Sequence, residues 1–326
     1  MSKRFPFPIP SGWFTVSWSS ELEAGQVVPL KYFGTDLVLF RDEDGAAHLL
    51  DAFCPHLGAH LGHGGVVKGK NLVCPFHAWE FGGDGACAHI PYAKRKPKRA
   101  DLKKWVTVEK DGLIYAWHDL EGTGPTWEVP DIPEFSSDEW SEVITRRWKI
   151  NTCNQEMAEN AVDAAHFQYL HGTRTMPETH AESFGPHMAA TSTTSMTTPA
   201  GPVDGNIEVN CWGFGWSTTR FRGIVETLLL GSPVPIDEES CEIRFTFSVK
   251  KFGGRSITDG VGKAFVKEIA RQLEQDIPIW ENKVYLNKPI LCDGDGPINV
   301  FRKWAKQFYP SDFKVEGWEN PALVAK

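Results

Sequence analysis

Residues 51–81 read "DAFCPHLGAHLGHGGVVKGKNLVCPFHAWEF" and contain two cysteines and four histidines among glycines and short apolar runs. Two pairs stand out, Cys54 with His56 and Cys74 with His77, and a proline follows each cysteine. Each pair offers one sulfur and one imidazole from a tight loop. Two thiolates and two imidazoles are enough to complete a tetrahedral zinc site. Zinc fingers, however, pair cysteine with cysteine and histidine with histidine, whereas both pairs here are mixed.

Mixed pairs suit a binuclear cluster in which one iron takes both thiolates and the other takes both imidazoles. That is the ligand set of a Rieske [2Fe–2S] centre, where histidine replaces cysteine on one iron and raises the reduction potential. The two loops resemble the Rieske loops of Rieske-type oxygenases. The resemblance implies that glycines after each loop allow backbone hydrogen bonds to the sulfurs and that Trp79 shields the cluster. A zinc site and a chance grouping of buried Cys and His are the alternatives.

Length and composition limit the classes of protein to consider. With 326 residues, of which 41% are hydrophobic, the chain is long enough for about two domains. The net charge of −8 disfavours nucleic acid as a partner, and the most basic stretch is the short "AKRKPKRA" at residues 93–100. Seven cysteines, and a first segment without the apolar core of a signal peptide, predict a cytoplasmic protein. No apolar run approaches the ~18 residues that a membrane span needs, so none is expected.

The composition changes twice along the chain and predicts an α+β protein. Residues 1–120 contain short strand-like runs between Gly, Asp and Pro, which predicts an N-terminal all-β domain around the two mixed loops. Residues 121–135 are rich in Pro, Gly and acidic residues and are predicted to be a linker. Residues 136–326 combine strand-like runs with one long helix at about 258–286, which predicts an antiparallel sheet gripping that helix. The Ser/Thr-rich stretch at about 189–200 is expected to be a loop.

A second group of polar residues lies in "ENAVDAAHFQYLHG", a stretch predicted to be helical. Its candidate site residues are Asn160, Asp163, His166 and His171. The first three are spaced by three residues and would share one face of a helix. His171 would lie about 140° from His166 on a regular helix, so both imidazoles reach one ion only if the helix ends or bulges near Leu170. Gly172 supplies a stop. Two histidines need a third ligand, a carboxylate, to hold non-heme Fe(II) with open positions for oxygen.

Asp276 on the predicted long helix is the candidate for that carboxylate. At about 100° per residue it falls about 20° from Phe265, within the apolar stripe that also contains Ile269, Leu273 and Trp280. Glu274 falls on the opposite side of the helix. Burying Asp276 without a partner would cost several kcal/mol, so a metal partner is expected. The alternative is that Asp276 caps a helix or pairs with a buried Arg or Lys.

The order of these motifs resembles the oxygenase (alpha) components of Rieske non-heme iron oxygenases over nearly the whole chain. In both, the pattern N-x-x-D-x-x-H-x4-H follows a Rieske domain. The resemblance implies a helix-grip (START-like) catalytic domain in which His166, His171 and Asp276 bind a mononuclear Fe(II). It also implies that Asp163 links an iron-ligating histidine to a Rieske histidine of a neighbouring subunit, and that Asn160 lies near the iron. The alternatives are an exposed helix carboxylate for Asp163 and an ordinary polar residue for Asn160.

Three further segments are similar to the group of 3-ketosteroid 9α-hydroxylases and cholesterol desaturases. They are "CPFHAWEFGGDGAC", "PYAKRKPKR" and "GDGPINVFRKWAKQFY", at residues 74–87, 91–99 and 294–309. This similarity implies an apolar, steroid-like substrate, and an oxygenase acting on a smaller aromatic substrate is the alternative. The segments "NCWGFGWSTTRF" and "RFTFSVKKF" alternate aromatic with polar residues, as strands do that line a flat apolar pocket.

The resemblance implies a terminal oxygenase that hydroxylates, demethylates or desaturates its substrate with O2 as co-substrate. No G-x-G-x-x-G fingerprint occurs, so no nucleotide site is predicted, and electrons are expected from a separate NAD(P)H-dependent reductase or ferredoxin. A homotrimer is expected by analogy, because in the family the two metal sites of one subunit are too far apart for electron transfer.

Two other classes of protein remain open at this point. The chain could be a Rieske-type electron carrier without oxygenase activity, or a zinc-stapled module that carries a lipid. Metal analysis separates the three: about three irons and two sulfides per chain for the oxygenase, about two irons for the carrier, and zinc without sulfide for the lipid module.

Overall fold

The computed structural model describes residues 3–198, 201–223, 225–252 and 255–315. The chain forms two compact units, one of residues 13–129 and the other of residues 130–326 together with 1–12. The first unit is all β and the second combines helices with an antiparallel sheet. The predicted α+β class is confirmed.

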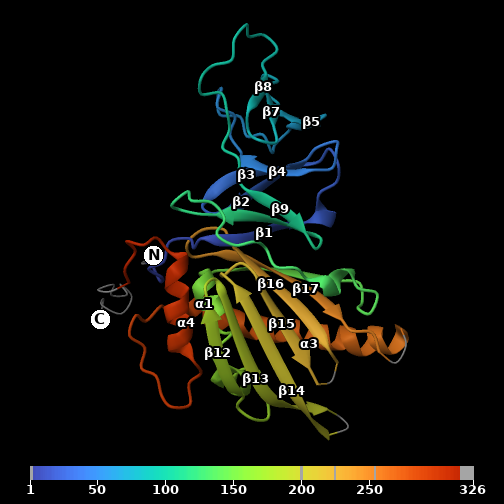
Figure 1. Cartoon of the computed structure of the whole chain (residues 1–326), viewed down its shortest axis with the longest axis vertical. Helices are drawn as coiled ribbons and strands as arrows, with labels where there is room; N and C mark the ends of the chain where they lie inside the picture. The colour runs from blue at the N-terminus through green and yellow to red at the C-terminus, as the bar shows by residue number, and fades with distance from the viewer. Residues whose placement is uncertain (1–2, 199–200, 224, 253–254, 316–326) are drawn as a thin grey trace. The chain divides into compact units, whose positions relative to one another are not determined.

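The first unit contains three small antiparallel sheets. The first joins β1 (Gly12–Trp18), β10 (Leu113–His118) and β9 (Thr107–Lys110) in that order. The second joins β2 (Val27–Tyr32), β3 (Thr35–Arg41) and β4 (Ala47–Asp51). The third joins β5 (Val66–Lys68), β6 (Asn71–Val73), β7 (Glu80–Gly82) and β8 (Cys87–His89), which lie together in Figure 1. Both mixed Cys/His loops are connections to this third sheet, because one follows β4 and the other joins β6 to β7.

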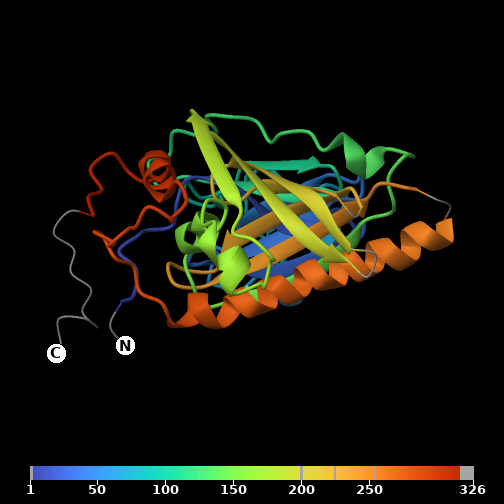
Figure 2. The same ribbon diagram turned by 90° about the horizontal axis from the view of Figure 1, so that it is seen from below.

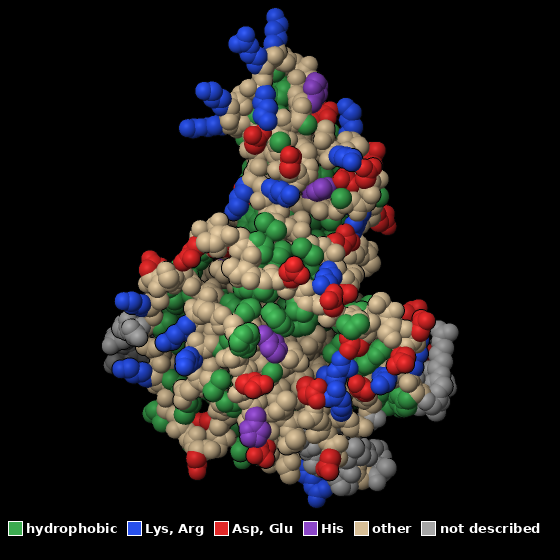
Figure 3. Space-filling model, in the orientation of Figure 1, with side chains coloured by type: hydrophobic (Ala, Val, Ile, Leu, Met, Phe, Trp, Pro, Cys, Tyr) green, Lys and Arg blue, Asp and Glu red, His purple; other side chains and the backbone are tan. Residues whose placement is uncertain are grey.

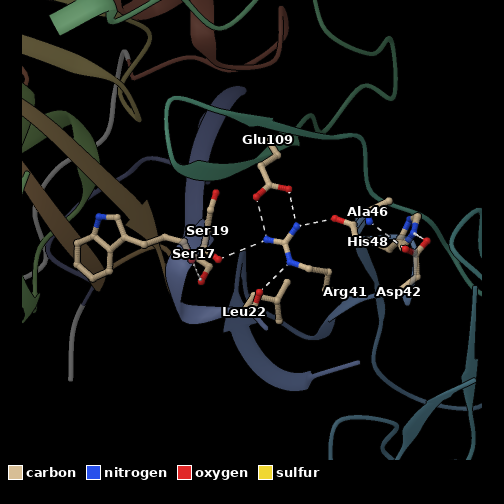
Figure 4. A network of polar contacts seen from close by, with 10 residues as sticks. Ser17, Ser19, Leu22, Arg41, Asp42, Ala46, His48 and Glu109 are labelled. Carbon is tan, nitrogen blue, oxygen red and sulfur yellow. Dashed lines mark hydrogen bonds and ion pairs between the residues drawn. The ribbon is translucent and has the colours of Figure 1, made fainter. Parts of the chain in front are cut away.

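Arg41 ties the first two sheets of this unit together (Figure 4). From the end of β3 its guanidinium donates two hydrogen bonds of 2.8 Å to the carboxylate of Glu109 on β9. It also donates to the carbonyl oxygens of Leu22 and Gly45, each at 2.7 Å. The hydrogen bonds from Arg41 hold the pKa of Glu109 below its ordinary value, even though partial burial acts in the opposite direction.

The second unit is built on a seven-stranded antiparallel sheet. Its strand order is β11-β17-β16-β15-β14-β13-β12. The strands are β11 (Ile144–Ile150), β12 (Glu178–Phe184), β13 (His187–Thr198), β14 (Gly201–Trp212), β15 (Ser217–Arg222), β16 (Thr227–Pro235) and β17 (Cys241–Val249). The helices are α1 (Asn154–Glu159), α2 (Ala165–Tyr169), α3 (Arg255–Asn282) and α4 (Ile298–Ala305).

The long helix α3 runs across one face of this sheet (Figure 2). Its buried residues Ile269, Leu273 and Trp280 belong to one apolar core with Ile243 and Phe245 of β17. The predicted stripe is therefore confirmed, and Glu274 is exposed, as the helical spacing indicates. Burial of each such side chain contributes about 1.5–3 kcal/mol, which fixes both the rotation of α3 and the side that faces the sheet.

The N-terminal segment packs on the second unit, although the sequence placed residues 1–120 in the first domain. The guanidinium of Arg4 donates to the carbonyl oxygens of Trp280 and Glu281, at 3.2 and 2.6 Å, where α3 ends. It also donates to the carbonyl oxygen of Asn151. Phe5 is completely buried. Because the last carbonyls of a helix lack intrahelical donors, a cation there both bonds them and favours the helix dipole. The helix ends at Asn282, a few residues before the expected end.

The Ser/Thr-rich stretch expected to be a loop at about 189–200 is a strand, so that expectation is wrong over most of its length. β13 pairs with β14 in register, with Met188 opposite Cys211 and Ser192 opposite Ile207. Met188, Ala190 and Ser192 are buried while the residues between them are more exposed. Such alternation is typical of a strand with one covered face, and β-branched threonines suit it. Residues 199 and 200 lie outside the described residues.

Candidate metal centres

The two Cys/His loops of the first unit have the same pattern of backbone hydrogen bonds. The amide of Cys54 donates to Ala59, and that of Cys74 donates to Trp79, at 2.9 and 2.8 Å. In return the carbonyl oxygen of each cysteine accepts a hydrogen bond from the residue four positions later, Gly58 or Ala78. Both of those residues have positive φ, 77° and 54°. The two cysteines therefore begin the same kind of turn, and each histidine lies within its turn. The sequence spacing did not reveal this repeated turn.

The four side chains of these loops fit a binuclear metal cluster. Cys54 and Cys74 are almost completely buried. The imidazole rings of His56 and His77 lie edge to face with centroids 4.6 Å apart, and the Nδ1 atom of each is buried without a hydrogen-bond partner among the described residues. A buried ring nitrogen without a partner is costly, and a metal ion removes that cost.

The cysteine sulfurs fit the same interpretation. Burial, together with the neighbouring Cys74, raises the pKa of Cys54 to about 11, so the metal-free thiol keeps its proton. A cluster iron binds the deprotonated sulfur and supplies the positive charge that this environment lacks.

Trp79 and Tyr92 cover the histidine side of this group. The ring of Trp79 stacks on His56, with centroids 4.9 Å apart and planes 9° from parallel. Its Nε1–H donates to the hydroxyl oxygen of Tyr92 at 2.8 Å. Trp79 is buried, which agrees with the shielding that the family resemblance implies, whereas Tyr92 is 60% exposed.

In the second unit, the expected helix over residues 159–172 is interrupted. Helix α1 ends at Glu159 and α2 begins at Ala165, so Asn160, Asp163 and His166 do not share one face of a continuous helix. The amides of Ala161 and Val162 donate to carbonyls three residues earlier, which tightens the chain after α1. The prediction of a shared helical face is therefore wrong, because the break between α1 and α2 changes the direction of each of the three side chains separately.

The side chain of Asp163 accepts hydrogen bonds at the start of α2. Its Oδ1 accepts hydrogen bonds from the amides of Ala165 and His166, at 3.1 and 3.4 Å. Its Oδ2 lies 3.7 Å from His166 Nδ1. Burial alone would raise the pKa of Asp163, but the hydrogen bonds and the charge of His166 outweigh burial and the pKa is lowered. The carboxylate is therefore ionised near neutral pH and contacts His166 directly.

His166 and His171 come to the same side because the helix ends where the sequence predicted. The amides of Leu170 and His171 both donate to the carbonyl oxygen of His166, at 2.8 and 3.2 Å, and Gly172 follows with φ of 75°. The two imidazole rings lie 5.0 Å apart at 80°. The predicted end near Leu170 is confirmed.

Oxygen acceptors fix the orientation of both imidazoles. His166 Nδ1 lies 2.6 Å from the carbonyl oxygen of Asp163, and His171 Nδ1 lies 3.2 Å from Oε1 of Gln275. When each Nδ1 carries the proton and donates it, each Nε2 has a free lone pair for a metal. Gln275 is a residue that the sequence analysis missed, since a glutamine on a helix carries no signal of its own.

Asp276 completes the group from α3. It is 7% exposed, and its Oδ1 lies 3.5 Å from His171 Nε2. One ligand atom each from His166, His171 and Asp276 lies within 4.8 Å of the other two. No Lys or Arg in the described part of the chain forms an ion pair with Asp276, and its charged partner is His171 when that imidazole is protonated. A buried carboxylate beside two oriented imidazoles has the donor set of a facial triad.

A cavity of about 190 Å³ opens onto these three residues between α3 and the sheet. Its walls are mainly apolar and include Phe167, Val209, Leu229, Ile243, Phe245 and Leu273. Asn160 also lines it, so this residue lies at the same site as His166. A few polar side chains, Ser192, Ser217, Thr219 and Gln272, interrupt the apolar surface. None of these four was singled out from sequence, because isolated Ser and Thr in strands are common on any sheet.

An all-β unit with a mixed Cys/His loop pair, followed by a helix-grip domain with a buried 2-His-1-carboxylate group, defines a Rieske non-heme iron oxygenase. The comparisons with known families agree. Residues 12–118 match the Rieske [2Fe-2S] domain, and residues 116–309 match the 3-ketosteroid 9alpha-hydroxylase C-terminal domain. The chain therefore belongs to the 3-ketosteroid 9α-hydroxylase family of Rieske oxygenases.

Curated relatives extend over most of the chain. It is 34% identical to a 3-ketosteroid-9-alpha-monooxygenase oxygenase component from Rhodococcus rhodochrous, over 91% of this chain and 82% of the relative. Identity to the protein of the same name from Mycobacterium tuberculosis is 32%, over 94% and 83%. Identity to cholesterol 7-desaturase nvd from Drosophila melanogaster is 33%, over 96% and 78%.

Solved structures share the fold at lower identity. Pseudomonas putida CBB5 NdmA with caffeine matches with a TM-score of 0.76 at 20% identity, over 90% of this chain and 89% of that one. Dicamba monooxygenase bound to 3,6-dichlorosalicylic acid matches with a TM-score of 0.72 at 19% identity, over 94% and 98%.

The chain is thus the terminal oxygenase component of a multicomponent Rieske system, an oxidoreductase that uses a Rieske cluster, mononuclear iron and O2. Oxygenase components of this kind need a separate reductase or ferredoxin. Among the described helices, none is both long and apolar enough to cross a membrane.

Proposed function

We propose that this oxygenase oxidises a flat, apolar polycyclic substrate of the steroid class, held in the cavity that opens onto His166, His171 and Asp276. The observation that carries this proposal is the apolar surface of the cavity, with a few polar groups beside the three candidate ligands. Apolar walls with few polar groups are typical of sites for apolar ligands. The curated relatives named for ketosteroids and cholesterol support the same substrate class.

We assign Cys54, His56, Cys74 and His77 to the Rieske cluster, and His166, His171 and Asp276 to the mononuclear iron. When bound, the cluster supplies one-electron transfer and the iron supplies oxygen activation. The protein's part is to hold these groups and the substrate. Gln275 and the carbonyl of Asp163 would keep the two imidazoles turned with Nε2 toward the iron position, and mainly apolar walls surround that position.

Polar groups in the cavity wall are suited to orient the substrate. Ser217 and Thr219 on β15 and Gln272 on α3 line the cavity. A keto or hydroxyl oxygen on a polycyclic ring needs such donors, because leaving it unpaired in an apolar site costs about 1–3 kcal/mol. These side chains would therefore select which carbon of the ring system faces the iron.

A smaller aromatic substrate is the second candidate, and the cavity volume favours it. About 190 Å³ is below the roughly 300–1,000 Å³ usual for sites that enclose drug-sized ligands. A steroid therefore requires wall side chains such as Phe245 to move on binding, whereas a single aromatic ring does not.

We further propose a cytoplasmic homotrimer, in which Asp163 also contacts a histidine of the neighbouring subunit. The side chain of Asp163 is 39% exposed and accepts hydrogen bonds mainly through Oδ1, which leaves Oδ2 open to a second donor. Light scattering on the purified protein tests the trimer, and an Asp163→Ala variant of unchanged mass and iron content should lose turnover.

The substrate class is tested with reduced, iron-loaded protein mixed with oxygen and one compound from a panel of ketosteroids, sterols and aromatic acids. We expect a ketosteroid or sterol to accelerate reoxidation of the cluster and to give an oxidised product by mass spectrometry. Acceleration by aromatic acids alone would favour the second candidate. Protein with zinc and no acid-labile sulfide would refute both.

A further inference from the structure

The strongest concentration of positive charge on the described surface is one short loop. Residues 91–99, "PYAKRKPKR", follow β8 and are exposed throughout; we call them the basic loop. They hold five cations and no acidic residue, while the whole chain carries a net charge of −8. Lysine and arginine side chains gather at the same place at the top of Figure 3, where the loop lies in Figure 1.

Most of this charge is not neutralised within the chain. Lys96 pairs with Asp101 at 2.7 Å. The other four cations form no ion pair with any residue that the structure describes; they are Lys94, Arg95, Lys98 and Arg99. Unpaired cations this close together repel one another, and an anionic partner relieves that repulsion.

The basic loop begins next to the candidate cluster ligands. Tyr92 is 60% exposed and accepts the hydrogen bond from Trp79, whose ring stacks on His56. A protein bound at the loop would therefore contact Tyr92, which is connected to the candidate cluster ligand His56 through the ring of Trp79. This continuous path of contacts distinguishes the basic loop from other basic surface of the molecule.

Exposed apolar side chains on the Cys/His loops and a small cavity at the base of the basic loop add to this surface. The loops that carry the candidate cluster ligands expose Leu57 by 65% and Phe76 by 61%, which offers a bound partner apolar contacts beside these ligands. A cavity of about 180 Å³ at the base of the basic loop is lined by His89, Lys94, Arg95 and Lys96 among others. It is open to a carboxylate from a partner, and apolar contacts ringed by charge are typical of transient protein interfaces.

We propose that the basic loop is the docking surface for the electron donor, and that the donor is a one-electron carrier protein with an acidic face. This proposal rests on the proposed function, since it requires that the chain receive electrons at Cys54, His56, Cys74 and His77. In each encounter the reduced donor loses one electron and is oxidised, and the oxygenase gains that electron; no bond is made and no proton moves. Complementary charge speeds such encounters and makes them sensitive to salt.

The test uses full-length, cluster-loaded protein and a reduced acidic plant-type [2Fe–2S] ferredoxin as the probe. The loop variant is Lys94→Glu with Arg95→Glu. The matched control is Lys263→Glu with Lys267→Glu on α3, where both lysines are exposed and the charge change is the same. The measurements are the dissociation constant at 50 and 300 mM salt and the second-order rate of cluster reduction by the ferredoxin in stopped flow.

We expect the loop variant to lose about tenfold or more in affinity and rate at low salt, and the wild type to lose about as much at high salt. The control should stay within about twofold. Reduction by dithionite should be the same in all three proteins, which shows an intact cluster. Equal behaviour of the loop variant and the control would overturn the proposal.

Two further outcomes would also overturn it. If the loop variant changes the mass in light scattering, the basic loop contacts a second copy of this chain. If the wild type binds a short DNA duplex as tightly as the ferredoxin and the loop variant does not, the partner is nucleic acid. Failure of the proposed function is separate, because it appears as missing iron or missing product in protein that still binds the ferredoxin.

Discussion

At the level of single residues, the proposed iron site depends on how two imidazoles are held. His166 directs Nδ1 at a backbone carbonyl and His171 directs Nδ1 at the side chain of Gln275. When both Nδ1 atoms carry the proton, the same nitrogen, Nε2, is left for a metal in both. Asp276 then adds a carboxylate from a different element, 3.5 Å from His171 Nε2. The proposed ligands come from the α2 region and from α3, and both imidazoles have hydrogen-bond partners that keep them in place.

Asp276→Ala should lower the iron content from about three to about two atoms per chain and abolish product formation, because two imidazoles alone bind Fe(II) weakly. The cluster spectrum should not change, since the cluster ligands lie in the other unit. Iron analysis and visible spectroscopy measure both effects. Glu274→Ala, on the exposed side of the same helix, is the control and should keep three irons. If Asp276→Ala kept the third iron, Asp276 would not be the ligand, and Asp293 and Asp295 would be the next carboxylates to test.

Gln275→Leu should weaken iron binding at His171 by about 10–100-fold, the usual effect of removing a hydrogen bond to a metal-ligating histidine. Equilibrium titration of the mononuclear site with Fe(II) measures the affinity directly. Gln275→Glu keeps an acceptor for His171 Nδ1 and should bind iron nearly as well as the wild type. Equal losses in both variants would mean that Gln275 contributes only through packing.

At the scale of secondary-structure elements, single polar side chains connect segments that are distant in sequence. Arg41 joins β3 to β9 in the first unit, and Arg4 joins the N-terminal segment to the end of α3 in the second. Each makes several hydrogen bonds from one planar guanidinium, a geometry that lysine does not reproduce. These two contacts hold the scaffolds on which the metal ligands are carried.

Glu109→Gln should destabilise the first unit at neutral pH and have little effect in acid. The pKa of Glu109 is lowered in the folded state, so its contribution is present above the unfolded value of about 4.3 and is lost as the pH falls through the lower folded value. Urea unfolding followed by loss of cluster absorbance, from pH 7 down to the limit of cluster stability, measures the difference. A difference between wild type and variant that grows as the pH falls would contradict this reasoning.

Arg4→Ala should lower the stability of the second unit by about 1–3 kcal/mol, because it removes a charged donor from several carbonyls at the end of α3. Thermal unfolding followed by helical circular dichroism is the measurement. Lys3→Ala is the matched control, since Lys3 pairs with Glu238 in an exposed position, where ion pairs contribute little. A similar shift in both variants would show that general charge, rather than the helix end, is responsible.

At the scale of the whole molecule, the two candidate metal sites belong to separate compact units. Each has its own buried core, around Leu72 and Phe81 in the first unit and around Phe247 and Leu273 in the second. Within one chain, the apolar packing around each candidate site therefore comes from that site's own unit.

A ferrous chelator should remove about one iron per chain and leave the cluster spectrum and the helical circular dichroism unchanged. The proposed mononuclear site lies on a cavity that is reachable from solvent, whereas Cys54 and Cys74 are buried in the core of the first unit. Iron analysis before and after desalting checks the stoichiometry, and re-addition of Fe(II) should restore turnover. Bleaching of the cluster in parallel with iron loss would indicate that the two sites are not independent.

Several features of this protein depend on local spacing and could be predicted from the amino-acid sequence. The two mixed Cys/His loops, the end of the helix before Gly172 and the apolar stripe around Asp276 were all predictable, because each follows from residue types within a few turns or one tight loop. The class of fold followed in the same way from the order of strand-like and helical runs.

Other features depend on partners far away in the sequence and are set by long-range packing. The break between α1 and α2, the strand β13 and the packing of residues 4–11 on the second unit each depend on segments that no local pattern identifies. The same holds for Gln275, whose role exists only because α2 lies beside α3. Local spacing fixes which side chains can act together along one element, whereas long-range packing determines which elements meet, because the apolar surface of each is buried by residues far away in the sequence.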